Sequence, residues 1–384
     1  MEKKNLGSIT MKHLSIAVSI VVFGILTAAI IVIINFSRTE AAADPLKDIT
    51  NVGLMLVGPR DDRGWSSSHY EALERISDEL RLNIIVKENI PTDNRCYDTI
   101  EDLVEDDNCK IVICASDLYG QYCEEAAKKY PDRVFLHCAG REEGPNIGSY
   151  FGRMYEIRYL SGIIAGNQTK TGHIGYVAAF PSSTVDRGIN AFTLGVRSIN
   201  PDATVHVSFC NSWTDDSLAE ASVNMLIDKC GADVISTHTD SLAVLRKADE
   251  RGAWIIDCDY DNSELFPDTY LTGCVWKWDS YYKEQILSAL QGKFRGEWQW
   301  LGIESGIMEL VDPAKTGNAY PGYETALETA RKQLTEHKTD VFYGPIKDID
   351  GRLRVAEGES MSDDRMYDKF DWYVEGVKIE ARVK

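Results

Sequence analysis

The sequence lacks the local signatures of the common α/β enzymes. It has no Gly-x-Gly-x-x-Gly after its first strand-like run, no Gly-x4-Gly-Lys-[Ser/Thr] phosphate loop and no Gly-x-Ser-x-Gly nucleophile elbow. No cysteine and histidine stand in a pattern that indicates a catalytic pair. We therefore expect no enzymatic activity, no catalytic residue and no cofactor. An enzyme stays as an alternative function.

Positive charge is also scarce. The chain has 41 lysine and arginine residues against 60 aspartate and glutamate residues, which gives a formal net charge of −19 over 384 residues. A polyanion such as DNA or RNA is repelled by a surface of this sign. The charge therefore argues against a nucleic-acid partner.

Only one segment, residues 14–36, is long and apolar enough to span a bilayer. Three lysines precede it and only Arg38 follows closely, so the positive-inside rule places residues 1–13 in the cytoplasm. Two interpretations stay open: a retained signal anchor, or a signal peptide cleaved after Ala43. In both, a linker at 37–47 leads to an exported part, at the outer face of the cytoplasmic membrane or secreted.

Cysteine is absent before Cys96, so the chain has no lipid-acceptor cysteine near the apolar segment. The nine cysteines form no Cys-x-x-Cys and have no histidines at zinc spacing. Most lie in apolar runs, which indicates buried thiols, while one or two disulfides stay open. The aspartates at 257–261 lack the glycine and final glutamate of a calcium loop. We expect no metal site.

Strand-like runs alternate with amphipathic helical stretches from residue 49 onward. The strand-like runs are apolar throughout, which is typical of strands covered on both faces, and helices between them indicate parallel sheets. There are too many such units for one sheet, so two doubly wound α/β lobes are predicted. The runs are 51–57, 82–88, 110–116, 133–139, 173–179, 204–210, 232–238 and 253–259.

The segments that follow these strands are rich in aromatic residues and carboxylates. In open α/β sheets, ligands bind beyond the carboxyl ends of the strands. Aromatic rings offer flat faces, and Asp and Asn offer directional hydrogen bonds, so the set suits a flat polar heterocycle or a sugar. The aromatic residues in or beside these loops are Trp65, Tyr119, Phe192, Trp213, Trp276 and Trp278.

Several long motifs in order resemble the basic membrane protein family of ABC-transporter substrate-binding proteins, which includes the purine nucleoside receptor. The resemblance covers about residues 50–384. It is to a subgroup that opens with Asp-His-Gly-Trp, which reads Asp62-Arg63-Gly64-Trp65 here. The other matching segments are 150–166, 188–195, 211–216, 238–241, 257–261, 341–351 and 371–377.

The resemblance implies a periplasmic-binding-protein type I fold with the ligand in an interlobe cleft. It implies lobes at 48–150 plus about 279–312 and at 151–278 plus about 313–384. It further implies a purine nucleoside or nucleobase as ligand, handed to a membrane permease with its ATPase subunit. A membrane-anchored sensor that presents its ligand to a receptor stays as an alternative.

The resemblance also implies roles for individual residues. Trp65 stacks on the base, with Phe192 and Trp213 offered on the opposite face. Asp259 and Lys277 match positions that hold ribose hydroxyls. The residues expected to form hydrogen bonds with the edges of the ligand are Asp62, Ser66, Ser116, Asn190 and Asp240. Tyr119 is added to the predicted site because of its position in a loop after a strand.

Structural alternatives accompany these roles. Trp65 can instead be a helix-start contact, Phe192 and Trp213 core residues, and Asp259 a turn cap. If Lys277 faces the cleft, the tryptophans on either side of it point together and pack in the core. Departures from the family pattern are Arg63 in place of histidine and Ser67 where an aromatic residue is common.

Overall fold

The computed structural model describes residues 45–380. The apolar segment predicted to be a signal anchor or signal peptide, at 14–36, lies outside this range. Among the described residues, no helix combines the length and the apolar character needed to cross a bilayer.

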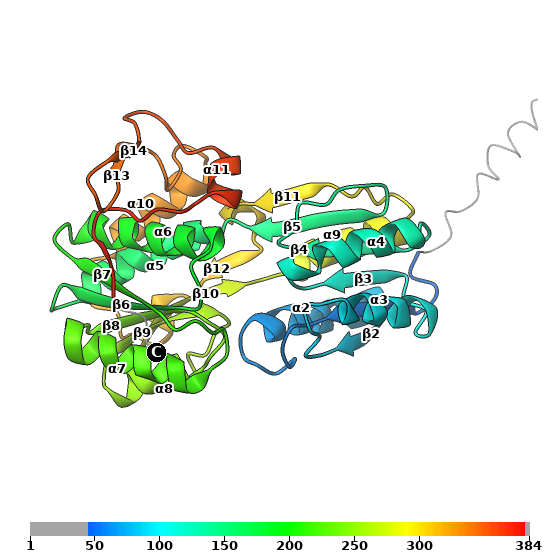
Figure 1. Ribbon diagram of the computed structural model, residues 1–384, viewed down its shortest axis with the longest axis horizontal. Coiled ribbons are helices and arrows are strands. Elements are labelled where there is room, and N and C mark those ends of the chain that lie inside the picture. The colour runs from blue at the N-terminus through cyan, green and yellow to red at the C-terminus, as the bar shows by residue number, and fades with distance from the viewer. Residues whose placement is uncertain (1–44, 381–384) are drawn as a thin grey trace, which may run out of the picture. The chain divides into compact units, whose positions relative to one another are not determined.

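The first sheet has six parallel strands in the order β11-β5-β4-β3-β1-β2. Its central strand β3 is apolar and fully buried, as expected for a strand covered on both faces. Figure 1 shows helices on both sides of this sheet. The elements are β1 (Thr50–Met55), α2 (Trp65–Leu80), β2 (Leu82–Lys87), α3 (Arg95–Glu105), β3 (Ile111–Cys114), η1 (Asp117–Tyr119), α4 (Gly120–Lys129), β4 (Val134–Cys138), β5 (Ile147–Gly152), α9 (Asp279–Leu290) and β11 (Trp298–Leu301).

The second sheet has seven strands in the order β12-β10-β9-β8-β6-β7-β15. All neighbours are parallel except β12, which runs antiparallel to β10. Helices α5 and α6 lie on one face, and α7 and α8 on the other (Figure 1). The elements are α5 (Met154–Gln168), β6 (His173–Ala178), α6 (Ser183–Ile199), β7 (Thr204–Phe209), α7 (Asp216–Cys230), β8 (Val234–His238), α8 (Ala243–Glu250), β9 (Trp254–Asp259), β10 (Tyr270–Trp276), β12 (Met308–Leu310) and β15 (Val377–Ile379).

The two parallel α/β sheets confirm the predicted fold class, and all eight predicted strand-like runs are strands. The division of the chain between two lobes at the predicted limits stays a prediction. Within the predicted first-lobe range 279–312, β11 joins the first sheet whereas β12 joins the second.

The last part of the described chain packs against the second sheet. Asn190 of α6 donates to the carbonyl of Trp372 at 2.7 Å and accepts from the amide of Val374 at 2.8 Å. These bonds direct the chain into β15, which pairs with β7. The remaining elements are η2 (Ile303–Ser305), η3 (Pro313–Lys315), α10 (Glu324–Thr335), β13 (Ile346–Lys347), β14 (Leu353–Val355) and α11 (Asp363–Asp368).

All nine cysteines are free thiols. Eight are buried, several of them in the apolar core between the first sheet and helices α3 and α4. The prediction of buried thiols is confirmed, and Cys230, at the end of α7, is the half-buried one.

Candidate ligand-binding site

Asp62 organises the loop between β1 and α2. One carboxylate oxygen accepts from the amides of Gly64 and Ser67, and the other accepts from the amide of Ser66, all at 2.9 Å. A carboxylate is stabilised at a helix N-terminus because free amides and the helix dipole meet it there. This loop therefore fixes the start of α2 and the position of Trp65.

Trp65 lies among aromatic side chains from both sheets. Its indole Nε1 donates to the carbonyl of Ala115, just after β3, at 2.9 Å. Its ring meets Trp276 and Trp278 edge to face, with centroids 5.8 Å and 6.2 Å apart. Trp276 and Trp278 stack on each other, with ring centroids 4.3 Å apart, and both are buried.

Three carboxylates, Asp62, Asp240 and Asp259, form what we call the aspartate cluster. A methyl group on Gly64 would lie 3.8 Å from an oxygen of Asp62 and 3.9 Å from an oxygen of Asp240. Burial, together with the charges of Asp259 and Asp62, raises the pKa of Asp240 well above its usual range. No side chain among residues 45–380 donates a hydrogen bond to the Asp240 carboxylate.

Asp259 ends β9 with a φ of 66°, in the left-handed region that a residue other than glycine rarely occupies. Its carboxylate accepts from Trp276 Nε1 at 2.8 Å. Burial raises its pKa, while the buried guanidinium of Arg158 opposes that rise. Arg158 is itself held by the carbonyl of Thr237 at 2.7 Å. Within the aspartate cluster, the charge of Asp259 is thus partly neutralised, whereas the neighbouring carboxylate of Asp240 has no partner.

Further buried polar atoms near the ends of these strands have no hydrogen-bond partner among the described residues. They include Ser66 Oγ, His238 Nδ1 and Tyr176 Oη. A methyl group on Gly188 would lie 3.4 Å from His238 Nδ1 and 3.5 Å from Tyr176 Oη, so these two atoms border the same niche. Buried polar atoms are normally paired, so unpaired ones mark places where water or a ligand binds.

Trp213 is an exposed aromatic residue in the loop after β7, with 40% of its surface accessible. Its carbonyl accepts from the amide of Asp240 at 2.9 Å, so the two residues are adjacent. The Trp213 ring contacts the ring of His238. Phe180, also partly exposed, lies near Trp213, with ring centroids 6.2 Å apart. An exposed ring beside an unpaired carboxylate is suited to contact a flat polar ligand.

Some predicted site residues are used inside the protein instead. Tyr119 is fully buried, and its hydroxyl donates to the carbonyl of Ile90 at 2.6 Å. Both amide atoms of Asn190 are engaged by the C-terminal segment, and Phe192 is fully buried against Tyr176. The structure does not bring these three side chains to the aspartate cluster.

Ser116 and Lys277 have other partners. Ser116 caps the turn after β3 by accepting from the amide of Leu118, although it directly follows Ala115, the partner of Trp65. Lys277 is half-exposed and pairs with Glu309 at 3.7 Å. Within the described part of the chain, no contact joins Lys277 to the aspartate cluster.

Arg63 bridges from the loop after β1 to the loop after β9. Its Nε donates to Asn262 Oδ1 at 2.8 Å, and its guanidinium pairs with Glu264 at 2.7 Å. Nearby, Tyr260 donates to Glu71 of α2 at 2.7 Å. We call these contacts the Arg63 latch, and it joins the two sheets beside the aspartate cluster.

Sequence reasoning missed Arg158, Phe180 and the buried atoms around Gly188. Arg158 lies in an apolar helical stretch, and its partner Thr237 is 79 positions away. No local pattern could indicate that contact. Phe180 directly follows a predicted strand, and its position in a post-strand loop was a usable signal.

The family model described as ABC transporter substrate-binding protein PnrA-like matches residues 49–336. A purine-binding protein of Brucella abortus is 32% identical over 328 residues, which cover 85% of this chain and 92% of that protein. A Haloferax volcanii protein, provisionally named an ABC transporter glucose-binding protein, is 30% identical and covers 90% of this chain and 85% of its own length.

Among solved structures, an ABC transporter solute-binding protein from Aeropyrum pernix K1 matches with a TM-score of 0.65. The match has 18% identity and covers 83% of this chain and 95% of that chain. The fold is therefore that of the type I periplasmic binding proteins. The chain belongs to the Bmp family of PnrA-like ABC transporter substrate-binding proteins, whose members are extracytoplasmic binding proteins rather than enzymes.

Proposed function

We propose that this protein captures a purine nucleoside or nucleobase between its two lobes and delivers it to the permease and ATPase of an ABC transporter. Trp65 and Trp213 would contact the flat faces of the ligand. The aspartate cluster would accept hydrogen bonds from its N–H and O–H groups.

The observation that carries the proposal is the unpaired Asp240 carboxylate beside the aromatic rings. Burial and the charges of Asp259 and Asp62 raise the pKa of the Asp240 carboxylate, which no side chain among residues 45–380 pairs with. A purine edge carries N–H groups, and a ribose carries hydroxyls, and both donate to carboxylates. A ligand of this kind would therefore supply the partner that Asp240 lacks.

A sugar is the second candidate, because one relative is provisionally named a glucose-binding protein. Sugar hydroxyls donate hydrogen bonds to carboxylates, just as the N–H groups of a purine edge do. The half-buried indole of Trp65 and the exposed ring of Trp213 favour the purine, since each base stacked on an aromatic ring contributes ~1–3 kcal/mol. The relative named as purine-binding supports the same choice.

Capture would proceed by lobe closure. The ligand would bind one lobe first, and the other would then exclude water and complete the contacts. The Arg63 latch would form on closure. Micromolar affinity requires about −8 kcal/mol, which two stacking contacts and several hydrogen bonds can supply after ordering costs.

Calorimetry of the full chain in mild detergent tests the proposal. The protein is first unfolded and refolded to remove any ligand retained during purification. It is then titrated with adenine, guanine, adenosine, guanosine, inosine, glucose and a pyrimidine nucleoside. Saturable binding of a purine at micromolar or lower Kd is expected. Binding of glucose alone would favour the sugar, and no binding at all would contradict both.

A further inference from the structure

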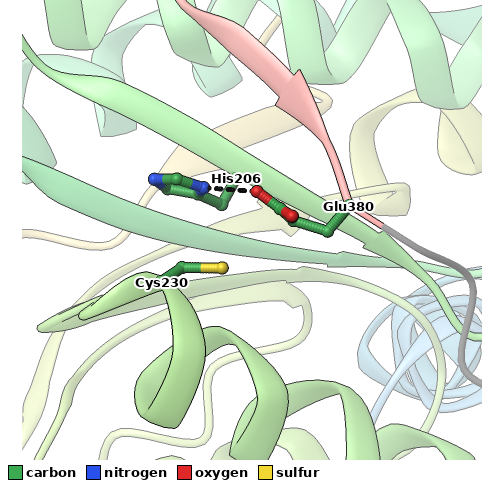
Figure 2. A group of neighbouring side chains, drawn as sticks. All are labelled: His206, Cys230 and Glu380. Atoms are coloured by element: carbon green, nitrogen blue, oxygen red, sulfur yellow. Dashed lines mark hydrogen bonds and ion pairs between the residues drawn. The ribbon is translucent and has the colours of Figure 1, made fainter.

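A group of side chains with metal-binding chemistry lies at the β15 edge of the second sheet. It consists of His206, Cys230 and Glu380, and one ligand atom from each lies within 4.8 Å of the other two. Figure 2 shows the three side chains converging from a strand, the end of a helix and the residue after the last strand. We propose that these residues form a zinc site.

The topology explains why the three residues meet. β15 pairs with β7 in a register that sets Lys378 opposite His206. Side chains two apart in a strand share a face, so Glu380 lies on the same face as His206. Cys230 is the last residue of α7, the helix that covers this face, and the chain turns at Gly231 with a φ of 74°. The group is thus built by three separate elements.

The donor set suits zinc. Zinc takes histidine nitrogen, thiolate sulfur and carboxylate oxygen in a tetrahedron, whose ligand atoms lie about 3.3–3.8 Å apart. The observed spread needs a contraction of about 1 Å to reach that geometry. Calcium and magnesium prefer oxygen ligands only, so a nitrogen–sulfur–oxygen set discriminates against them. Water would fill the fourth position, because β15 is an edge strand.

A neighbouring histidine, His173, contacts the ring nitrogen of His206 that does not face Glu380. His206 Nδ1 faces Glu380 at 2.8 Å, and its Nε2 lies 3.0 Å from Nδ1 of His173. With a metal on Nδ1, His206 Nε2–H would donate to His173. Metal-bound histidines normally have such a partner on the other nitrogen, because it fixes the ring and its tautomer. His173 is therefore a positioning residue for the site.

Zinc binding would change the partners of two ligands. Lys378 lies 2.9 Å from Glu380 and would move aside, leaving the carboxylate to the ion. The thiol of Cys230 would release its proton on binding.

A bound ion would tie β15 to β7 and to α7. Each of these elements would supply one ligand to the same ion at this edge of the second sheet. The expected role is structural, because no part of the aspartate cluster belongs to this group.

The test uses the full chain, stripped of metal with a chelator and titrated with Co²⁺ as a spectroscopic probe and with Zn²⁺ by calorimetry. One equivalent should bind, and Co²⁺ should give the near-ultraviolet absorption of a cobalt–thiolate bond. Cys230→Ser should abolish that absorption. Glu380 lies after the last strand, and Glu380→Gln should weaken Zn²⁺ binding at least tenfold. His173→Gln should weaken Zn²⁺ binding about 10–100-fold.

His337→Asn is the control, because His337 is an exposed histidine near Glu304 outside the group. It should leave binding unchanged. Zinc should also protect the half-buried Cys230 from alkylation, read by mass spectrometry, which requires no variant to fold. Binding that survives Cys230→Ser and Glu380→Gln, alkylation indifferent to zinc, or the absence of one-equivalent binding would each overturn the proposal.

Discussion

Trp65 and Trp276 meet edge to face with ring centroids 5.8 Å apart, although one begins α2 beside the first sheet and the other ends β10 of the second. Trp276 also donates to Asp259 at 2.8 Å. An aromatic contact between the sheets is thus linked to the aspartate cluster by one hydrogen bond. Changes to Trp65 should therefore reach both the ligand and the fit of the two lobes.

Replacing Trp65 with alanine should weaken purine binding about 5–150-fold, because a stacking contact of ~1–3 kcal/mol is lost. Calorimetry measures the affinity, and circular dichroism checks that the fold persists. Trp254→Ala is the matched control, since the half-buried Trp254 packs on Tyr320 outside the site. A loss below twofold for Trp65→Ala would remove Trp65 from the site.

Replacing Asp240 with asparagine should have opposite effects on stability and on binding. The raised pKa means that the folded state disfavours the charged carboxylate, so stability falls as pH rises from the unfolded value towards the folded one. The variant removes that loss and should melt higher at pH 7 without ligand. It should nevertheless bind the purine at least tenfold more weakly.

Thermal melts and calorimetry at pH 7 measure both effects of Asp240→Asn. Asp202→Asn, at an exposed position, is the control and should change neither. A variant that binds as well as the original protein would show that Asp240 does not contact the ligand.

The Arg63 latch should control how long the ligand stays bound. Arg63→Ala removes a bond to the buried Asn262 and a pair with the exposed Glu264. We expect ligand dissociation to become about 5–10-fold faster in stopped-flow measurements, since one buried hydrogen bond contributes ~1 kcal/mol. Glu264→Gln should change it less than twofold, because exposed ion pairs contribute little. Equal effects of the two variants would contradict this division.

Glu156 should make stability depend on pH independently of the ligand. It is buried on α5, accepts from the amide of Ile303 at 2.7 Å, and burial raises its pKa to about 8. The folded state therefore holds its proton, and stability falls as pH rises from about 4.5 to about 8.

Glu156→Gln keeps an acceptor for Ile303 and removes this titration. Relative to the original protein, the variant should gain on the order of a few kcal/mol in free energy of unfolding at pH 8.5 and little at pH 4. Denaturant unfolding at both pH values measures the difference. A gain of the same size at both would show that the fold does not raise the pKa of Glu156.

Predictions from sequence succeeded where the signal is local. Long apolar runs such as 110–116 and 173–179 identify central strands, because both faces of those strands are covered. β5 is absent from the predicted strand-like runs, because glycines interrupt its apolar pattern. β11 and β12 are short strands at sheet edges, and they carry too few apolar residues to stand out.

For the site, the rule that ligands bind beyond strand ends located Asp62, Asp240 and Asp259 correctly at strand ends. It could not tell which helical side chains lie near the aspartate cluster. Asn190 lies in α6, and its partners at 372 and 374 are more than 180 positions away, so nothing near it in the sequence indicates that both amide atoms are occupied.

The pairing of β15 with β7 also sets the order in which the chain can finish folding. Val374 is bonded to a residue 184 positions earlier, and the strand at 377–379 that follows covers the edge of β7. The first sheet needs nothing beyond Leu301. During synthesis the first sheet can therefore be complete while β7 of the second is still unpaired on one side. A chain cut short before residue 377 would keep the edge of β7 available to other chains.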